Sequence, residues 1–253
     1  MTNLKNRFSG IALLVFCTTL FLSCSSNSVA EQDDGFRSLF NGEDLSGWII
    51  PEGDGGHWKV EDGVIDYDAM SQAPGDKNLW SEEEFDDFVL RLDWRIKETP
   101  FVNQNTRIIR PDGTYQRDAD GNPISIAVPD SDSGIYLRGM SKAQVNIWCW
   151  PVGSGEVWGY RTDSEMPPEV VAGVTPNTMA DNHIGEWNSF EITMVDDRLT
   201  VELNGVVVIE DAQLPGVDDR GPIALQHHGS KVDGEWTSSP SLVQFRNIYI
   251  KEL

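Results

Sequence analysis

Acidic, imidazole and amide side chains flank two predicted strands in a pattern that suits acid–base chemistry and sugar binding. Asp132 precedes a predicted strand over Gly134 to Arg138, and Gln226 and His228 belong to an apolar run near the C-terminus. Successive side chains of a strand point to opposite faces, so Gln226 and His228 are expected on one face and His227 against the core. An imidazole can act as a base or bind a metal. The alternative for either histidine is a buried, hydrogen-bonded place in the core.

A second polar face is predicted over Gln144 to Trp148, another short alternating run. Gln144, Asn146 and Trp148 share one side of this strand. The two amides can donate to and accept from sugar hydroxyls. The indole of Trp148 offers a flat apolar surface to a sugar ring, although core packing is the alternative.

A glycine-rich turn follows this strand, with the sequence Gly153-Ser154-Gly155-Glu156-Val157-Trp158-Gly159-Tyr160. It lacks the Lys-Ser/Thr pair and the following helix pattern of a phosphate-binding loop. Glycines let the backbone approach a ligand closely. Glu156 is therefore a candidate general base, and Tyr160 is a candidate substrate contact.

Two arginines lie on polar faces of predicted strands. Arg95 follows Asp93 by two residues in the run Phe88 to Ile96, and Arg138 shares the face of Tyr136. A guanidinium at such a place can contact a ligand. The alternative is an ion pair on a solvated sheet face.

The segments that must position these residues are strands. Short alternating runs divided by Gly, Asp, Asn and Pro recur along the chain, with hairpin signals at Asp62-Gly63 and Asn204-Gly205. Helical periodicity is nearly absent. The pattern predicts an all-β fold, either a sandwich or a jelly roll. The long polar segments Pro100 to Asp132 and Gly159 to Gly185 are expected to rim its concave face.

The N-terminal segment has the pattern of an export signal. Lys5 and Arg7 precede an apolar run, Ile11 to Leu22, which is followed by Ser23 and Cys24. We predict a lipoprotein signal peptide over 1–23, a lipidated Cys24, a flexible tether over 24–34 and one domain over 35–253. The protein would be exported and lipid-anchored in the bacterial cell envelope, in the periplasm or facing the surface. The alternative is an ordinary signal peptide with an incidental cysteine.

Composition excludes several classes of function. The formal net charge of the 253-residue chain is −22, which argues against nucleic acid as a partner and against binding to anionic headgroups. Contact with the membrane is therefore expected through the lipid anchor only. Cys149 would be the one remaining thiol, which excludes an intramolecular disulfide and a cysteine-rich zinc site. The sequence has no Gly-x-Ser-x-Gly elbow and no His-Glu-x-x-His motif.

Several blocks, taken in order, resemble the 3-keto-disaccharide hydrolase family, formerly a domain of unknown function. The resemblance runs from about Gly35 to Leu253 and is carried by Phe36 to Trp48, Trp58 to Ile65, Phe88 to Arg95, Ser133 to Arg138, Gly185 to Asn188, Leu203 to Gly205 and the C-terminal blocks Arg220 to Gly229 and Val243 to Leu253. It implies a concanavalin A-like lectin/glucanase fold, an all-β jelly-roll sandwich of two antiparallel sheets. Some members of the family cleave glycosides whose sugar carries a ketone at C3. Two features depart from the family pattern. Asp132 stands where the family usually has Asn, and the segment Pro100 to Asp132 is longer than usual.

The resemblance also implies a chemistry. A C3 ketone acidifies the proton at C2, so a base can form an enolate that expels the C1 leaving group, and water can add afterwards. We expect Glu156 or His228 as base and Asp132 as acid or metal ligand. The sugar and oxyanion contacts would come from Arg95, Arg138, Gln144, Trp148, Tyr160 and Gln226.

The expected partner is a carbohydrate, a 3-keto-glycoside or an oligosaccharide. A divalent ion, held by Asp132 and His228, could stabilise the enolate. No organic cofactor is expected. The alternative function is a carbohydrate-binding lipoprotein without catalysis, which would use the same concave face.

Overall fold

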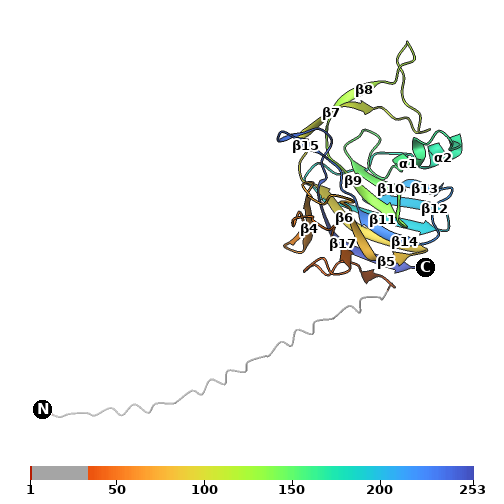
Figure 1. Ribbon diagram of the computed structural model, residues 1–253. Coiled ribbons are helices and arrows are strands. Elements are labelled where there is room, and N and C mark those ends of the chain that lie inside the picture. Colours follow the sequence, from red (N-terminus) through yellow and green to blue (C-terminus); the bar gives the residue numbers. More distant parts are fainter. Residues whose placement is uncertain (2–33) are drawn as a thin grey trace. The chain divides into compact units, whose positions relative to one another are not determined.

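The computed structural model describes Met1 and residues 34–253, of which Gly35–Leu253 form one compact unit (Figure 1). The predicted signal peptide, Cys24 and nearly all of the tether lie outside the described residues, so they stay predictions. Among the residues described, no helix is long and apolar enough to cross a membrane.

The larger of two antiparallel sheets has eight strands. Its order is β13-β12-β11-β6-β17-β4-β3, and β1 pairs with the C-terminal strand β17. The strands are β1 (Arg37–Ser38), β3 (Trp58–Glu61), β4 (Val64–Asp68), β6 (Phe88–Ile96), β11 (Asn188–Val195), β12 (Arg198–Leu203), β13 (Val206–Gln213) and β17 (Leu242–Glu252).

The smaller sheet has five strands in the order β10-β9-β14-β5-β2. They are β2 (Trp48–Ile49), β5 (Leu79–Phe85), β9 (Asp132–Leu137), β10 (Met140–Trp148) and β14 (Gly221–Leu225). The central pairing matters most for the site. Asp132 of β9 lies opposite Trp148 of β10, and Tyr136 lies opposite Gln144 on one side and Ala224 of β14 on the other.

The core fills the space between the sheets. In β6, every second side chain from Phe88 to Ile96 is buried, and Ile135, Val145 and Ile147 of the smaller sheet belong to the same apolar cluster. Full burial of such a side chain stabilises the fold by about 1.5–3 kcal/mol. The alternation therefore fixes which side chains of β9 and β10 point away from the core. The fold is an all-β jelly-roll sandwich, as predicted.

Two hairpin turns predicted from Asp-Gly and Asn-Gly are confirmed. Asp62 and Gly63 have φ values of 50° and 77°, and Asn204 and Gly205 have 53° and 79°. Two successive residues with positive φ define the turn type that matches the twist of the flanking strands.

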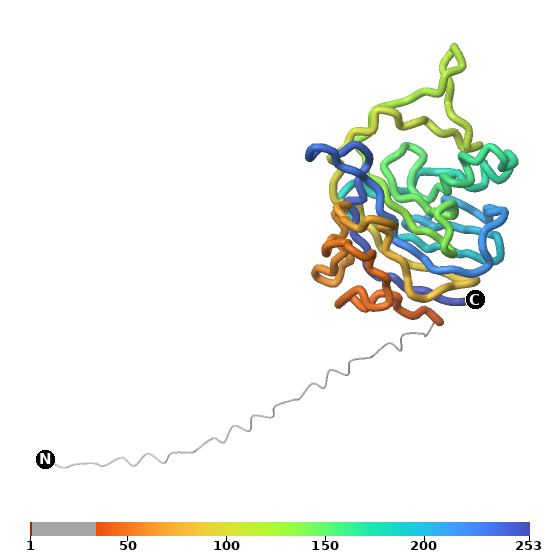
Figure 2. Tube along the Cα trace, in the orientation of Figure 1, coloured from red at the N-terminus to blue at the C-terminus, as the bar shows by residue number. Residues whose placement is uncertain are grey.

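The two long polar segments contain strands and short helices and are not irregular loops throughout. The first contains a two-stranded arm, β7 (Phe101–Arg107) and β8 (Ser125–Asp130), which projects beyond the sheets (Figure 2). The second begins within α1 (Trp158–Arg161) and continues through α2 (Pro168–Gly173). A further hairpin, β15 (Lys231–Val232) with β16 (Glu235–Trp236), follows β14. The arm, α1 and the stretch after β16 all contribute residues to one cavity.

Candidate active site

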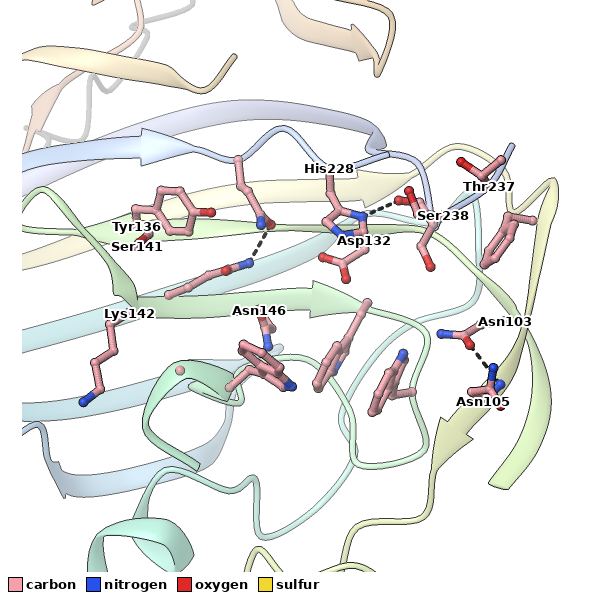
Figure 3. A pocket seen from close by; sticks show the side chains of 18 residues that line it. Asn103, Asn105, Asp132, Tyr136, Ser141, Lys142, Asn146, His228, Thr237 and Ser238 are labelled. Atoms are coloured by element: carbon pink, nitrogen blue, oxygen red, sulfur yellow. Dashed lines mark hydrogen bonds between the residues drawn. The ribbon is translucent and has the colours of Figure 1, made fainter. Parts of the chain in front are cut away.

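A cavity of about 780 Å³ lies on the face of the smaller sheet that points away from the core. Figure 3 shows the side chains that converge on it from β9, β10, the arm and the C-terminal segment. The lining residues are Phe101, Asn103, Asn105, Asp132, Tyr136, Ser141, Lys142, Gln144, Asn146, Trp148, Trp150, Trp158, Gly159, Gln226, His228, Thr237, Ser238 and Ser239. A volume of this size is typical of small-molecule sites.

Five residues predicted from the sequence line this one cavity. They are Asp132, Gln144, Trp148, Gln226 and His228, and Asn146, predicted on the same strand face as Gln144, lines it as well. Strand alternation brings Asp132, Gln144 and Trp148 to this face, because their neighbours Ile135, Val145 and Ile147 are in the core. The strand predicted near the C-terminus ends earlier than expected, at Leu225, so Gln226 and His228 reach the cavity from the segment that follows β14. Their chemical roles remain predictions.

The two glutamines form one rigid amide pair. Gln144 Nε2 donates to Gln226 Oε1 at 2.5 Å and to the Ser133 carbonyl at 3.2 Å. The side chain of Gln144 lies over the backbone of Gly134, where a Cβ atom would stand 2.8 Å from Gln144 Cγ. The sequence Ser-Gly-Ile thus needs glycine so that the amide can cross β9.

Aromatic rings form another part of the wall. Trp148 and Trp150 stack with centroids 4.5 Å apart and an interplanar angle of 3°. The Trp148 indole donates to the Gly153 carbonyl at 2.7 Å. Trp158 of α1 is 49% exposed and also lines the cavity. Flat apolar faces beside fixed amides suit a sugar ring and a second ring attached to it.

His228 is held in one tautomer by the backbone. Its Nδ1 lies 2.6 Å from the Ser239 carbonyl oxygen, and its backbone N–H donates to Ser241 Oγ at 2.6 Å. A carbonyl can only accept, so Nδ1 carries the proton and the lone pair of a neutral ring is at Nε2. The neighbouring His227 turns the other way, with its Nδ1 2.7 Å from the hydroxyl of the buried Tyr67.

The carboxyl group of Asp132 lies beside the His228 ring, as Figure 3 shows. Burial raises the pKa of Asp132 to about 7, the interaction with His228 lowers it and the negative charge of Asp130 raises it. A carboxyl with a pKa near neutrality can donate a proton under conditions where an ordinary aspartate is ionised. An imidazole and a protonatable carboxyl thus lie side by side in a sugar-sized cavity.

Glu156 is not where the sequence predicted. It is fully buried, forms an ion pair with the buried guanidinium of Arg161 and does not line the cavity. The backbone carbonyl of Glu156 accepts the backbone N–H of Asn146, and the backbone N–H of Gly155 donates to the carbonyl of Asn146. These bonds place the turn behind the cavity floor. Burial raises the pKa of Glu156 to about 7, with Arg161 lowering it. The prediction of Glu156 as the base is therefore corrected to a structural role.

Arg138 and Tyr160 are also structural. The guanidinium of Arg138 is 1% exposed and donates to the Asp87 carboxylate and to the carbonyls of Asp86, Asp196 and Asp218. Four such bonds join separate loops at one end of the sandwich.

Tyr160 belongs to the apolar core, with the Lys142 ammonium 4.5 Å from its ring centroid. Arg95 lies in β6 of the other sheet, where it donates to Gln244 and lies over the Trp187 ring. Arg95, Arg138 and Tyr160 all lie outside the cavity lining. The predictions that Arg95, Arg138 and Tyr160 contact the substrate are therefore corrected.

Several cavity residues were missed by the sequence analysis. Phe101, Asn103 and Asn105 belong to the arm, and Ser239 follows the hairpin β15–β16. The alternation Phe-x-Asn-x-Asn within the arm was a usable signal. Nothing in the sequence pattern says that the arm lines the same cavity as β10, because that arrangement depends on tertiary packing.

The donor set for a metal is small. Asp132 and His228 are the cavity residues that offer a carboxylate and an imidazole. Within the part of the chain that the structure describes, no three His, Cys, Asp or Glu side chains gather as a metal site. Catalytic zinc sites typically have three protein ligands. Two such ligands do not fit a resident divalent ion of that kind.

Comparison with solved structures shows the same fold in two crystal structures of candidate glycosyl hydrolases from Parabacteroides distasonis ATCC 8503. One is 22% identical, with a TM-score of 0.55 over 87% of this chain and 84% of that chain. The other is 21% identical, with a TM-score of 0.54 over 87% and 94%. No curated protein matches the chain.

The family model of the 3-keto-alpha-glucoside-1,2-lyase-like domain matches residues 35–251. This range runs from β1 into β17, ending one residue before that strand does, and includes every residue that lines the cavity. The chain therefore belongs to the 3-keto-disaccharide hydrolase family.

Proposed function

We propose that the protein cleaves the glycosidic bond of 3-keto-glycosides by removing the C2 proton. The observation that carries this proposal is the pair His228 and Asp132. The imidazole is held with its Nδ1–H on the Ser239 carbonyl, so Nε2 can take up a proton. Beside it lies a carboxyl whose pKa is raised to about 7 by burial. One group can accept a proton while the other gives one.

The proposed reaction has two proton transfers. His228 Nε2 takes the proton from C2, and the electrons of the C2–H bond form an enolate with the C3 ketone. The enolate collapses, the C1–O bond breaks, and Asp132 gives its proton to the departing oxygen. The product is a 1,2-unsaturated 3-keto sugar. Addition of water, with OH at C1 and H at C2, completes a net hydrolysis and lets both side chains recover their starting protonation states.

Neutral groups are proposed to stabilise the enolate oxygen. Lys142 is the one Lys or Arg among the cavity-lining residues, and its ammonium is 2.6 Å from the Asp163 carboxylate. The amides of Gln226 and Asn146 remain as donors at the floor. A site with an acidic group and one already paired cation favours an uncharged sugar over a phosphorylated or acidic one.

The aromatic part of the cavity favours a substrate with a second ring. The stacked Trp148 and Trp150, together with Phe101 and Trp158, offer apolar surface next to the polar floor. The sugar that loses its C2 proton would lie at Asp132 and His228, and the leaving group would lie along these rings. A disaccharide or an aryl glycoside fits this division.

We also propose that the protein acts outside the cytoplasm, anchored by lipid at Cys24. The support is the sequence pattern of the first 24 residues, which lie almost entirely outside the described part of the chain. The expected site of action is the periplasm or the cell surface.

The decisive experiment compares p-nitrophenyl 3-keto-α-glucoside and 3-keto-disaccharides with their unoxidised parents, with and without EDTA. The proposal expects release of the leaving group from the 3-keto compounds only, at the same rate with chelator. Binding of these sugars without product would support the alternative, a non-catalytic carbohydrate-binding protein. Loss of activity with EDTA, restored by a divalent ion, would show that a metal ion takes part in the reaction.

A further inference from the structure

A fully buried carboxylate lies behind the cavity wall without touching the proposed reacting groups. Asp130 is the last residue of β8 and is 0% exposed. In the described part of the chain it forms no ion pair within 4.0 Å. Burying a carboxylate away from water is costly unless hydrogen bonds replace its hydration. The hydrogen-bond partners of Asp130 therefore define what it does.

Four donors from three separate segments converge on this one side chain. Oδ2 accepts from Asn103 Nδ2 at 3.2 Å, from Trp150 Nε1 at 3.2 Å and from Ser239 Oγ at 2.8 Å. Oδ1 accepts from the backbone N–H of Cys149 at 3.3 Å. Asn103, Trp150 and Ser239 all line the cavity, and they come from the arm, from the end of β10 and from the stretch after β16.

One of these bonds leads directly to His228. Ser239 donates its hydroxyl to Asp130 and accepts the Nδ1–H of His228 at its carbonyl oxygen, 2.6 Å away. The same stretch is held at the next residue, because the Pro240 carbonyl accepts from Ser131 Oγ at 2.5 Å. The backbone that orients the imidazole is thus tied to the β8–β9 junction.

We propose that Asp130 is the positioning residue of this site: it fixes the tautomer and orientation of His228 through Ser239, and it holds the arm and Trp150 against the cavity. The inference deepens the proposed function and rests on His228 being the base. Asp130 touches no reacting atom. Its effect is to set geometry, and a misplacement of about 1 Å can cost roughly 100-fold in rate.

The test uses two variants and one control. Asp130→Asn keeps the size of the side chain, but its NH₂ group must face at least one of the donors, whichever way the amide turns. Ser239→Ala removes a single donor and leaves the carbonyl in place. Asp181→Asn is the matched control, because Asp181 also accepts a backbone N–H, at 3.0 Å from Ser154, and is not among the hydrogen-bond partners of His228 or Ser239.

The first readout needs no substrate. In ¹⁵N-histidine NMR of the intact domain at pH 8, the wild type should show His228 with the proton on Nδ1, assigned by its loss in His228→Gln. Asp130→Asn and Ser239→Ala should move a fraction of the ring to the Nε2–H tautomer, whereas Asp181→Asn should not. The second readout is turnover of p-nitrophenyl 3-keto-α-glucoside, where kcat should fall about 10- to 100-fold with a smaller change in KM.

The outcomes separate the two proposals. Folded Asp130→Asn and Ser239→Ala proteins with an unchanged His228 spectrum and unchanged kcat would overturn the role of Asp130. A shifted tautomer in a wild-type protein that cleaves no 3-keto-glycoside would keep the positioning role and reject the proposed function. If Asp130→Asn does not fold, Ser239→Ala decides by the same two readouts.

Discussion

The side chain of Gln144 crosses directly over the backbone of Gly134, at a distance that leaves no room for a Cβ atom. This contact lets Gln144 reach Gln226 on the far side of β9, so one glycine permits the amide pair that forms the cavity floor.

Gly134→Ala should therefore weaken sugar binding. The methyl group would push Gln144 aside and break its bond to Gln226, which we expect to raise KM roughly five- to tenfold, the effect of one lost neutral hydrogen bond. Gly75→Ala is the control, because a Cβ there meets no atom within 4 Å and the backbone is not left-handed. Equal KM values for the two variants would contradict the floor described here.

The two adjacent histidines should respond in opposite ways. His228→Gln should lower kcat by about 10²- to 10⁴-fold, the range for a general base, with little change in Tm. His227→Gln should lower Tm, because the buried Tyr67 hydroxyl loses its partner, and should leave turnover nearly intact. The reverse pattern would exchange the roles of the two residues.

Stability should also depend on pH through His227. Burial lowers the pKa of His227 to about 4, from an ordinary value of 6.5. The unfolded chain then takes up a proton below pH 6.5 that the folded chain refuses until about pH 4. The stabilisation is complete above pH 6.5 and is lost as pH falls towards 4. Denaturant unfolding from pH 4 to 8 should show a steeper acid loss for wild type than for His227→Gln. If the free energy of unfolding fell equally with pH in both proteins, the acid sensitivity would belong to groups other than His227.

Activity should fall on the alkaline side as Asp132 ionises. Its pKa is raised to about 7, and the proposed acid works only when protonated, so kcat should decline as pH rises through about 7. The Asp132→Asn enzyme should cleave its substrate much more slowly, and its rate should not decline as pH rises through about 7. A pH series of single-turnover rates would show both effects. A substrate whose leaving group departs without protonation, such as a p-nitrophenyl glycoside, should restore part of the cleavage rate of this variant. An alkaline decline that persists in Asp132→Asn would assign it to another group.

Lipid attachment gives a further prediction. Cys24→Ala should abolish labelling by radioactive palmitate and release the protein into the soluble fraction or leave an unprocessed precursor. Cys149→Ala is the control thiol, since it lies in the folded domain and should leave labelling unchanged. Membrane fractionation of Cys24→Ala with wild-type processing would reject the lipoprotein assignment.

Alternation along strands predicted much of the fold and part of the site. It separated core from polar faces in β6 and β10, and it placed Gln226 and His228 on the side that the cavity occupies. It could not say which sheet bears the site. Arg95 was correctly assigned to the polar face of β6, but this face belongs to the larger sheet and points away from the cavity.

The remaining errors concern turns and long-range contacts. Glu156 lies in a turn, where period two carries no information, and its pairing with Arg161 depends on how α1 folds back. Arg138 has a positive φ of 49° at the end of β9, which directs its side chain to loops distant in sequence. Ser239 acts through its carbonyl oxygen, a group that every residue has. Such roles depend on tertiary packing, so the residue types and their spacing do not predict them.

A 3-keto-glucoside deuterated at C2 shows whether the C2 proton is removed before the glycosidic bond breaks. If His228 abstracts this proton, the wild-type rate should show a primary kinetic isotope effect. The product formed in ordinary water should also lose deuterium to the extent that the protonated ring exchanges with solvent before C2 is reprotonated. His228→Gln should lower the rate of cleavage and the rate of deuterium loss together. Cleavage by the wild type with no primary isotope effect and with full retention of deuterium at C2 would contradict removal of the C2 proton, because the C2–H bond would then stay intact while the glycosidic bond breaks.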